Sequence, residues 1–187
     1  MSIKLLPPIY QIKINLNNAK PPIWRRVLVP SQINLATLHT LIQTVMGWQN
    51  CHLHQFIDGR IFYGVNDGFS DEMGYEDEHQ YQLNQILKTV KDQFIYEYDF
   101  GDNWEHTILL EKILPHAKDK QQPRCITGRC ACPPEDCGGI WGYQDLVDIL
   151  NDLKHPEYAD SLEWVGGEFD YKYFNIDDIN ARLAEQK

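Results

Sequence analysis

Basic residues are scarce in this chain. Among its 187 residues, 17 are Lys or Arg and 27 are Asp or Glu, which gives a formal net charge of −10. The longest run of basic residues is the pair Arg25-Arg26. A protein that binds the phosphate backbone of a nucleic acid needs a basic face. The composition therefore favours a protein partner over nucleic acid.

Long apolar segments and familiar catalytic signatures are also lacking. No apolar run approaches the length of a membrane span, and the N-terminus has no signal-peptide core, so we expect a cytoplasmic protein without a membrane partner. No Gly-rich phosphate loop, nucleophile elbow, His-Glu-x-x-His zinc signature or internal repeat occurs. The residues alone therefore assign no reaction, and whether the chain is an enzyme is left open.

What the chain does contain is enough apolar material for one core. Its hydrophobic fraction is 43%, ordinary for a globular protein, and its length suits one domain spanning residues 1–187. Alternation of apolar and polar residues predicts strands at 10–16, 23–29, 51–57 and 61–63. Apolar spacing predicts a helix over 35–46, capped by Asn34 and ended by Gly47, and further helices over 143–153, 156–164 and from 176 onward.

The stretch 94–112, FIYEYDFGDNWEHTILLEK, is the predicted centre of the fold. It alternates on both sides of Gly101-Asp102-Asn103, which is turn chemistry. With 101–103 as the loop, Phe100 pairs with Trp104 and Tyr98 pairs with His106, so the large apolar groups share one face. This register sets Asp99 opposite Glu105.

These elements predict an α+β fold. We expect a mixed or antiparallel sheet, with the 35–46 helix packed on one face and the C-terminal helices against the sheet or one end. The order β-β-α-β-β in the first half is also that of a ubiquitin-like unit. The acidic segment 65–79 carries no basic residue, and we expect it to be a solvated loop that is mobile over 66–79.

Polar residues gather at the tip of the predicted hairpin. The candidate catalytic residues are Asp99, Asp102 and His106 there, together with Glu135 and Asp136 from a rigid Pro-Pro-Glu-Asp turn. We expect Asp99 to be at least partly buried and paired either with an arginine, which is favoured, or with a metal ion. His52 and His54, two residues apart on one strand, fit either a metal pair or a structural role, and the structural role is favoured.

The candidate binding residues are Arg25, Arg26 and Trp104. Adjacent residues of a strand point to opposite faces, so one of the two guanidiniums must lie beside apolar groups. It needs a carboxylate partner or a path to water, and a stem lying on the sheet with its head in water is favoured over ligand binding.

Four cysteines are crowded into the spacing Cys-x4-Cys-x-Cys-x4-Cys, at Cys125, Cys130, Cys132 and Cys137. Four thiolates are the right number for tetrahedral zinc, but structural zinc sites usually carry Cys-x2-Cys pairs. The alternative is a set of reduced, partly buried thiols in a compact loop. Zinc is thus one candidate cofactor, held by these four residues.

Several segments together resemble the plasmid pRiA-type (Ri-plasmid) open-reading-frame-three-like family. They are KPPIWRRVLVP at 20–30, LATLHTLIQTVMGW at 35–48, HLHQF at 52–56, YEYDFGDNWEH at 96–106, PPEDCGGIWGY at 133–143 and the tail with EFD at 168–170. The resemblance covers roughly residues 8–184. It implies an α+β domain found on plasmids, mobile elements and ordinary prokaryotic chromosomes, without an established activity. Some members are labelled as insertion-element passenger (TnpR-like) proteins, but the chain has no serine- or tyrosine-recombinase motif.

Two functions from different classes follow. The first, which is favoured, is a non-catalytic binding or adaptor protein associated with mobile elements, whose acidic surface meets a basic partner. The second is a metal-dependent hydrolase or nuclease that uses the carboxylates and histidines near the 94–112 hairpin and the Pro-Pro-Glu-Asp loop.

Overall fold

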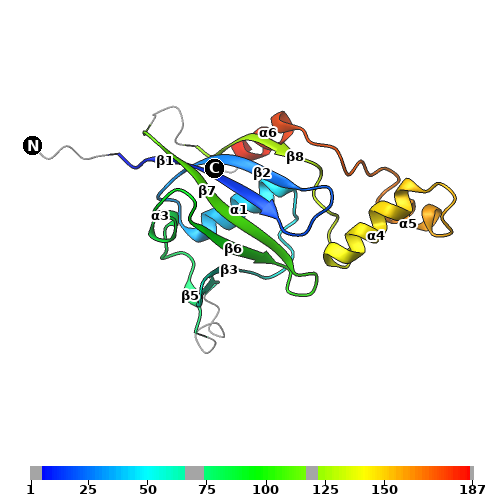
Figure 1. Ribbon diagram of the computed structural model, residues 1–187, viewed down its shortest axis with the longest axis horizontal. Helices are drawn as coiled ribbons and strands as arrows, with labels where there is room; N and C mark the ends of the chain where they lie inside the picture. The colour runs from blue at the N-terminus through cyan, green and yellow to red at the C-terminus, as the bar shows by residue number, and fades with distance from the viewer. Residues whose placement is uncertain (1–5, 66–73, 117–121, 186–187) are drawn as a thin grey trace, which may run out of the picture.

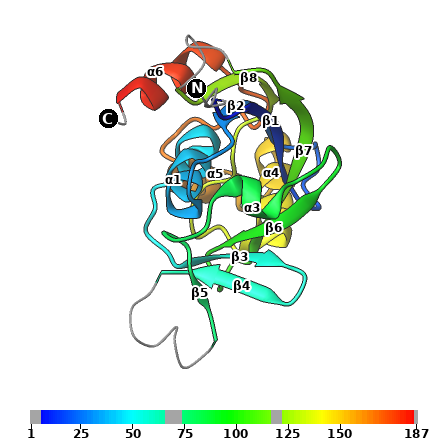
Figure 2. The ribbon, with the colours of Figure 1, turned by 90° about the vertical axis from the view of Figure 1, so that its left-hand side faces the viewer.

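The computed structural model describes residues 6–65, 74–116 and 122–185. One curved sheet forms a layer that wraps around helix α1, and two helices, α4 and α5, extend from one end (Figure 1; Figure 2). The strands are β1 (Ile9–Leu16), β2 (Trp24–Pro30), β3 (His54–Asp58), β4 (Ile61–Gly64), β5 (Glu76–Asp77), β6 (Gln93–Tyr98), β7 (Trp104–Leu114) and β8 (Arg124–Arg129). The helices are α1 (Leu35–Met46), α3 (Leu83–Ile86), α4 (Gly139–Asn151), α5 (Tyr158–Trp164) and α6 (Ile176–Glu185). The α+β class predicted from the sequence is confirmed.

The sheet is mixed, with the strand order β5-β4-β3-β6-β7-β1-β2-β8. All its neighbouring pairs are antiparallel except β4 with β5, which is parallel. Strands β6 and β7 occupy the middle. The long strand β1 follows β7 on one side, and β3 leads from β6 to β4 and β5 on the other. A ubiquitin-like N-terminal half is not confirmed. Strand β8 was not predicted from the sequence.

Helix α1 covers the concave face of the sheet (Figure 2). Asn34 begins it by accepting a hydrogen bond from the Thr37 N–H at 2.9 Å, and Gly47 ends it in a left-handed conformation, as predicted. Its apolar stripe is fully buried against apolar side chains of the sheet; the helix contributes Leu35, Leu38, Ile42 and Val45, and the strands contribute Ile12, Ile14, Val27, Phe56, Tyr96 and Ile108. Burial of this area is the main source of stability for both elements.

The register of the central hairpin differs from the prediction by two residues. Tyr98 pairs with Trp104 and Tyr96 with His106, so Glu97, and not Asp99, lies opposite Glu105. The loop begins at Asp99, because this residue takes a left-handed conformation (φ 57°) and its carboxylate accepts a hydrogen bond from the Gly101 N–H. A shift of two residues keeps the same side chains on the same face, so the predicted buried face is correct. Phe100 is the exception, since it lies in the loop and is 47% exposed.

The acidic segment is only partly a solvated loop. Residues 66–73, on which most of the predicted mobility falls, lie outside the described residues. Beyond them, Glu78 is buried, and its carboxylate lies 2.8 Å from Nε2 of His54. His54 in turn stacks on His39 with a 3.5 Å centroid separation, so it has the favoured structural role.

Candidate functional site

Three segments that are distant in the sequence meet beside the β6–β7 turn. They are the connection from α1 to β3, the turn at 99–103 and the loop that joins β8 to α4. The turn is fixed to the loop by Asp102, whose carboxylate accepts a hydrogen bond from the Gly138 N–H at 3.1 Å. Gly139 packs so tightly here that a Cβ atom would lie 2.4 Å from the Asp102 carbonyl oxygen. Only glycine fits this position, which explains the Gly-Gly pair after the acidic turn.

His52 lies at the centre of the place where these segments meet. Its Nε2 atom is 3.1 Å from a carboxylate oxygen of Asp136, 3.6 Å from one of Asp99 and 4.0 Å from one of Glu135. Asp99 and Glu135 are buried at their side chains (11% and 9% exposed), whereas that of Asp136 is 70% exposed. The cluster therefore has a closed inner side and one open side.

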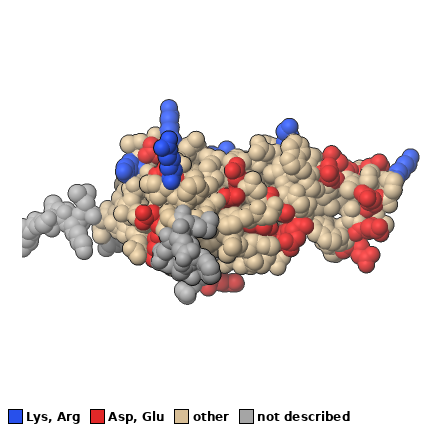
Figure 3. Space-filling model, turned by 90° about the horizontal axis from the view of Figure 1, so that it is seen from below, with Lys and Arg blue, Asp and Glu red and all other residues tan. Residues whose placement is uncertain are grey.

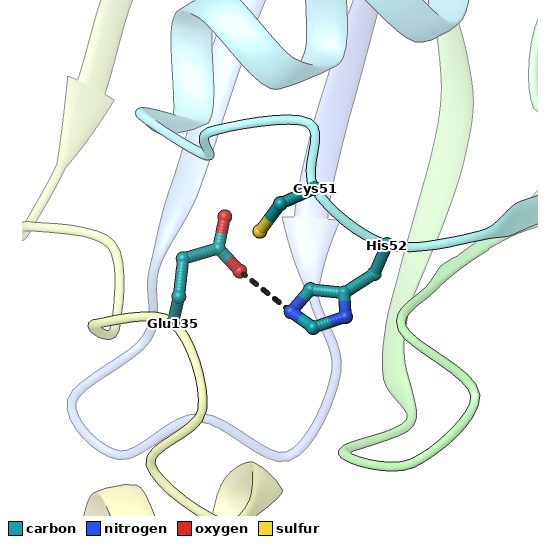
Figure 4. A group of neighbouring side chains, drawn as sticks. All are labelled: Cys51, His52 and Glu135. Carbon is teal, nitrogen blue, oxygen red and sulfur yellow. Dashed lines mark ion pairs between the residues drawn. The ribbon is translucent and has the colours of Figure 1, made fainter.

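Glu135 has one occupied oxygen and one unoccupied oxygen. Oε1 accepts hydrogen bonds from the Gln49 N–H at 2.7 Å and from the Tyr98 hydroxyl at 3.2 Å. Oε2 is buried without a hydrogen-bond partner among the described residues, and so is Nε2 of His52. Figure 4 shows the Glu135 carboxylate directed toward the His52 ring, with the Cys51 thiol beside them. Two buried polar atoms that face each other without a hydrogen bond are costly unless a further group binds between them.

The donor atoms match a divalent metal ion. Within the described part of the chain, two groups of three side chains place their ligand atoms within 4.8 Å of one another: His52 with Asp99 and Asp136, and His52 with Cys51 and Glu135. Ligands at about 2.1 Å from one metal lie about 3.0 to 3.4 Å apart, close to the two shortest distances from His52. Mixed imidazole and carboxylate donors suit Zn²⁺, Mn²⁺ or Fe²⁺ better than Ca²⁺ or Mg²⁺.

Neither arginine reaches Asp99, so the favoured arginine pairing is wrong. Arg26 binds Glu111 through two hydrogen bonds of 2.5 and 2.8 Å on the outer face of the sheet. Arg25 is 3% exposed, and its Nε and Nη1 donate to the backbone carbonyls of Val45, Trp24 and Arg129 at 2.8 to 3.0 Å. Its head is thus neither in water nor bound to a carboxylate, which corrects the expectation of a solvated head.

Other predicted residues have structural positions. His106 and Trp104 are fully buried, and His106 Nδ1 lies 2.8 Å from the Trp104 carbonyl oxygen. Burial lowers the pKa of His106 to about 4, so its ring is neutral. Neither side chain belongs to the groups of neighbouring ligand atoms. Of the predicted catalytic residues, Asp99, Glu135 and Asp136 therefore converge, Asp102 fixes the loop beside them, and His106 lies in the core.

Three of the four clustered cysteines, Cys130, Cys132 and Cys137, lie in the same loop, and Cys125 lies in β8. None of Cys125, Cys130, Cys132 and Cys137 belongs to the groups of neighbouring ligand atoms among the described residues. Burial raises the pKa of Cys125, Cys132 and Cys137, the last to about 12, which favours neutral thiols. A zinc site at these four residues stays a prediction.

Sequence reasoning missed three members of the site. Cys51, Tyr98 and the backbone of Gln49 were not among the candidates, and His52 was assigned only to a possible pair with His54. The sequence offered one signal: His52 lies between the end of the predicted helix and the strand that follows. A side chain in such a connection does not have to pack on the sheet and can point toward other segments. His52, Asp99 and Glu135 are 47 and 36 residues apart in the sequence, so no local pattern connects them.

Comparison of the sequence with known proteins identifies its family. Residues 8–178 match the family model described as Plasmid pRiA4b ORF-3-like protein. The chain belongs to this family. It is 34% identical over 182 residues to the uncharacterized protein y4hQ of Sinorhizobium fredii (strain NBRC 101917 / NGR234), covering 97% of this chain and 93% of that protein.

A solved relative of this pRiA4b ORF-3-like chain has the same fold. The crystal structure of MM3350 from Methanosarcina mazei Go1, described as a protein of unknown function, superposes with a TM-score of 0.83 at 35% identity. The match covers 92% of this chain and 98% of that one.

In the described residues, no helix is both long and apolar enough to span a membrane.

Proposed function

We propose that this pRiA4b ORF-3-like protein is a metal-dependent hydrolase whose divalent ion is bound at His52. His52, Asp99 and Asp136 supply the ligands, and Glu135 supplies either a fourth ligand or the base that takes a proton from water. The observation that carries the proposal is the pair of buried atoms without a hydrogen bond, His52 Nε2 and Glu135 Oε2, with two more carboxylates within 4 Å of His52 Nε2.

Charge supports a cation at this position. Three carboxylates face one imidazole, so even a protonated His52 leaves the cluster with an excess of negative charge. Among the residues that the structure describes, no Lys or Arg forms an ion pair with these carboxylates, so a metal ion would supply the missing positive charge. A bound divalent ion lowers the pKa of a water ligand toward neutrality and so generates a nucleophile. The open side at Asp136 gives a substrate access to that position.

The test measures metal content and turnover together. Protein purified without an affinity tag should bind about one Mn²⁺ or Zn²⁺ per chain by calorimetry and elemental analysis. His52→Ala and Asp99→Asn should weaken binding at least tenfold, since each removes one ligand. Asp148→Asn, an exposed carboxylate on α4 outside the cluster, is the matched control and should bind like the parent chain.

Turnover is measured with bis(p-nitrophenyl) phosphate and p-nitrophenyl esters in the presence of the bound ion. Metal-dependent hydrolysis that Asp99→Asn abolishes and Asp148→Asn preserves supports the enzyme. Equal metal affinity in all three variants would overturn the site. Stoichiometric, ligand-dependent metal binding without turnover on either substrate class would overturn the hydrolase and leave a metal-binding protein.

A second candidate is the non-catalytic adaptor, favoured by the surface of α4 and α5. Between residues 139 and 170 there are eight acidic residues and one lysine, a net −7 of the −10 for the chain. Figure 3 shows acidic side chains gathered at this end. Trp141 and Trp164 are 82% and 54% exposed, so aromatic and acidic groups are presented together.

The adaptor proposal includes an association with mobile elements, which is suggested by the plasmid name of the family. It is tested by crosslinking in the host cell. A basic partner encoded on the same element should crosslink to the parent chain and be lost from a Trp141→Ala/Trp164→Ala variant. Equal crosslinking of both proteins, or none by either, would contradict it.

A further inference from the structure

A separate pocket lies where α6 meets the end of α1 and the segment that follows β8. Its volume is about 350 Å³, at the lower end of the range for small-molecule sites. Its walls include Arg25, Arg182, Cys132, Tyr173, Phe174 and Asp178. None of these residues belongs to the cluster around His52.

Arg25 gives this pocket a buried positive charge. Only 3% of the residue is exposed, and no carboxylate among the described residues lies within ion-pair distance of it. Its three hydrogen bonds to carbonyl groups use Nε and Nη1, and none uses Nη2. The guanidinium carbon lies 5.1 Å from the centre of the Phe174 ring, which covers one face of the group. One edge of the guanidinium therefore lacks an acceptor, although burying such a charge without a counter-ion is costly.

Arg182 brings a second positive charge to the same pocket. It lies in the last turn of α6 and makes no ion pair or hydrogen bond in the part of the chain that the structure describes. A Cβ atom added to Gly47 at the end of α1 would lie 3.9 Å from its Nη1 atom, so the guanidinium head is close to Gly47, which also lines the pocket. The two positive charges in one pocket repel each other, and an anion bound between them would be attracted to both and would offset that repulsion.

Asp178 is the one acidic side chain in the lining. Its Oδ2 atom already accepts a hydrogen bond from the Tyr173 hydroxyl at 2.8 Å. With two guanidiniums and one carboxylate, the lining still carries a net positive charge. This is unusual for a chain with a net charge of −10.

We propose that this pocket binds a small organic oxyanion, a carboxylate or a phosphate, between Arg25 and Arg182, with its apolar part against Phe174 and Tyr173. Guanidinium groups bind both oxyanions through pairs of parallel hydrogen bonds, and the aromatic rings provide an apolar surface next to that position. The site is independent of the proposed metal centre.

The experiment uses the full chain and two probes, benzoate and phenyl phosphate, at constant ionic strength set with sodium chloride. Calorimetry should detect saturable binding of at least one probe, and thermal unfolding should shift upward with its concentration. Arg182→Ala should weaken binding at least tenfold. Arg182→Lys keeps the charge but loses the planar pair of N–H donors, so its affinity should lie between those of the parent chain and Arg182→Ala. Arg124→Ala removes an exposed arginine that does not line the pocket and should bind like the parent chain.

The preferred probe identifies the oxyanion class. Asp99→Asn should leave probe binding unchanged, so loss of the metal site and loss of this site are distinguishable. Absence of binding by both probes in the folded parent chain would overturn the proposal. Equal affinity in Arg182→Ala and the parent chain would also overturn it, because binding would then occur elsewhere.

Discussion

The hydroxyl group of Tyr98 connects the core hairpin to Glu135. It donates a hydrogen bond to Oε1 of Glu135 at 3.2 Å and accepts one from the Cys51 N–H at 3.0 Å. The ring itself is fully buried against Trp48, with a centroid separation of 5.5 Å. One side chain thus anchors two of the three segments of the candidate site to the sheet.

Substitutions of Tyr98 should separate stability from site geometry. Tyr98→Ala should destabilise the fold by about 3 kcal/mol or more, because a buried aromatic ring is removed. Tyr98→Phe keeps the ring and should cost only about 1 kcal/mol, while weakening metal binding because Glu135 loses one of its two anchors. Urea unfolding and metal calorimetry measure the two effects. A Tyr98→Ala variant as stable as the parent chain would contradict the central place of this hairpin.

Arg25 and Arg26 should differ sharply in their tolerance of lysine. Arg25→Lys should cost about 2 kcal/mol, since an ammonium group cannot replace three directed hydrogen bonds to buried carbonyls. Arg26→Lys, on the half-exposed outer face, should cost about 1 kcal/mol or less. The measurement is the free energy of unfolding in urea. Similar losses for the two variants would be inconsistent with the burial described for Arg25.

Gly142 should not accept a side chain. A Cβ atom there would lie 1.9 Å from the carbonyl oxygen of Cys137, so Gly142→Ala must displace the start of α4 or the loop before it. We expect a loss of about 1 to 3 kcal/mol and weaker metal binding, because the same loop carries Glu135 and Asp136. Gly74→Ala is a useful control. A Cβ atom added at Gly74 would meet no atom within 4 Å, so only the positive φ of this residue opposes the substitution. Thermal melts with and without Mn²⁺ provide both readouts, and an unchanged Gly142→Ala variant would rule out this packing.

Acidification should destabilise the protein through two buried histidines. Burial lowers the pKa of both His39 and His106 from 6.5 to about 4. Between these values the unfolded chain binds more protons than the folded one, so lowering the pH from 6.5 toward 4 favours unfolding. The stability that these neutral rings contribute is complete above pH 6.5. Measuring the free energy of unfolding in urea at pH 7.5 and at pH 5 tests this. The difference between the two values should be smaller in His106→Gln, and equal stability of the parent chain at the two pH values would contradict the prediction.

The zinc prediction has its own test. If the four cysteines bind a structural zinc ion, the metal should survive dialysis and vanish in Cys132→Ser. The metal proposed at His52 should be retained in that variant. Elemental analysis of Cys132→Ser and His52→Ala side by side distinguishes the two sites. A zinc content per chain that is unchanged between Cys132→Ser and the parent chain excludes the four-cysteine site.

Local signals in the sequence account for much of the fold. Asn34 and Gly47 bound a helix whose apolar spacing is regular, so α1 could be placed to the residue. The hairpin faces followed from alternation, but its turn did not, because a left-handed Asp99 is set by contacts that alternation does not describe. The site depends on the approach of residues near 52, 99 and 135, which is a property of the long-range strand order. Arg25 was misjudged for the same reason, since its acceptors are carbonyls of Val45 and Arg129 that only the folded chain brings near.

The two adjacent arginines have a consequence for the response of the sheet to acid. Arg26 donates its hydrogen bonds to the carboxylate of Glu111. These bonds lower the pKa of Glu111, but strong acid still protonates it. The acceptors of Arg25 are peptide carbonyls, which do not gain a proton in that range. The junction of β2, β8 and the end of α1 is therefore fastened by bonds that acid leaves intact. When the carboxylate contacts of the outer face have been lost, this junction should be the last part of the sheet to come apart.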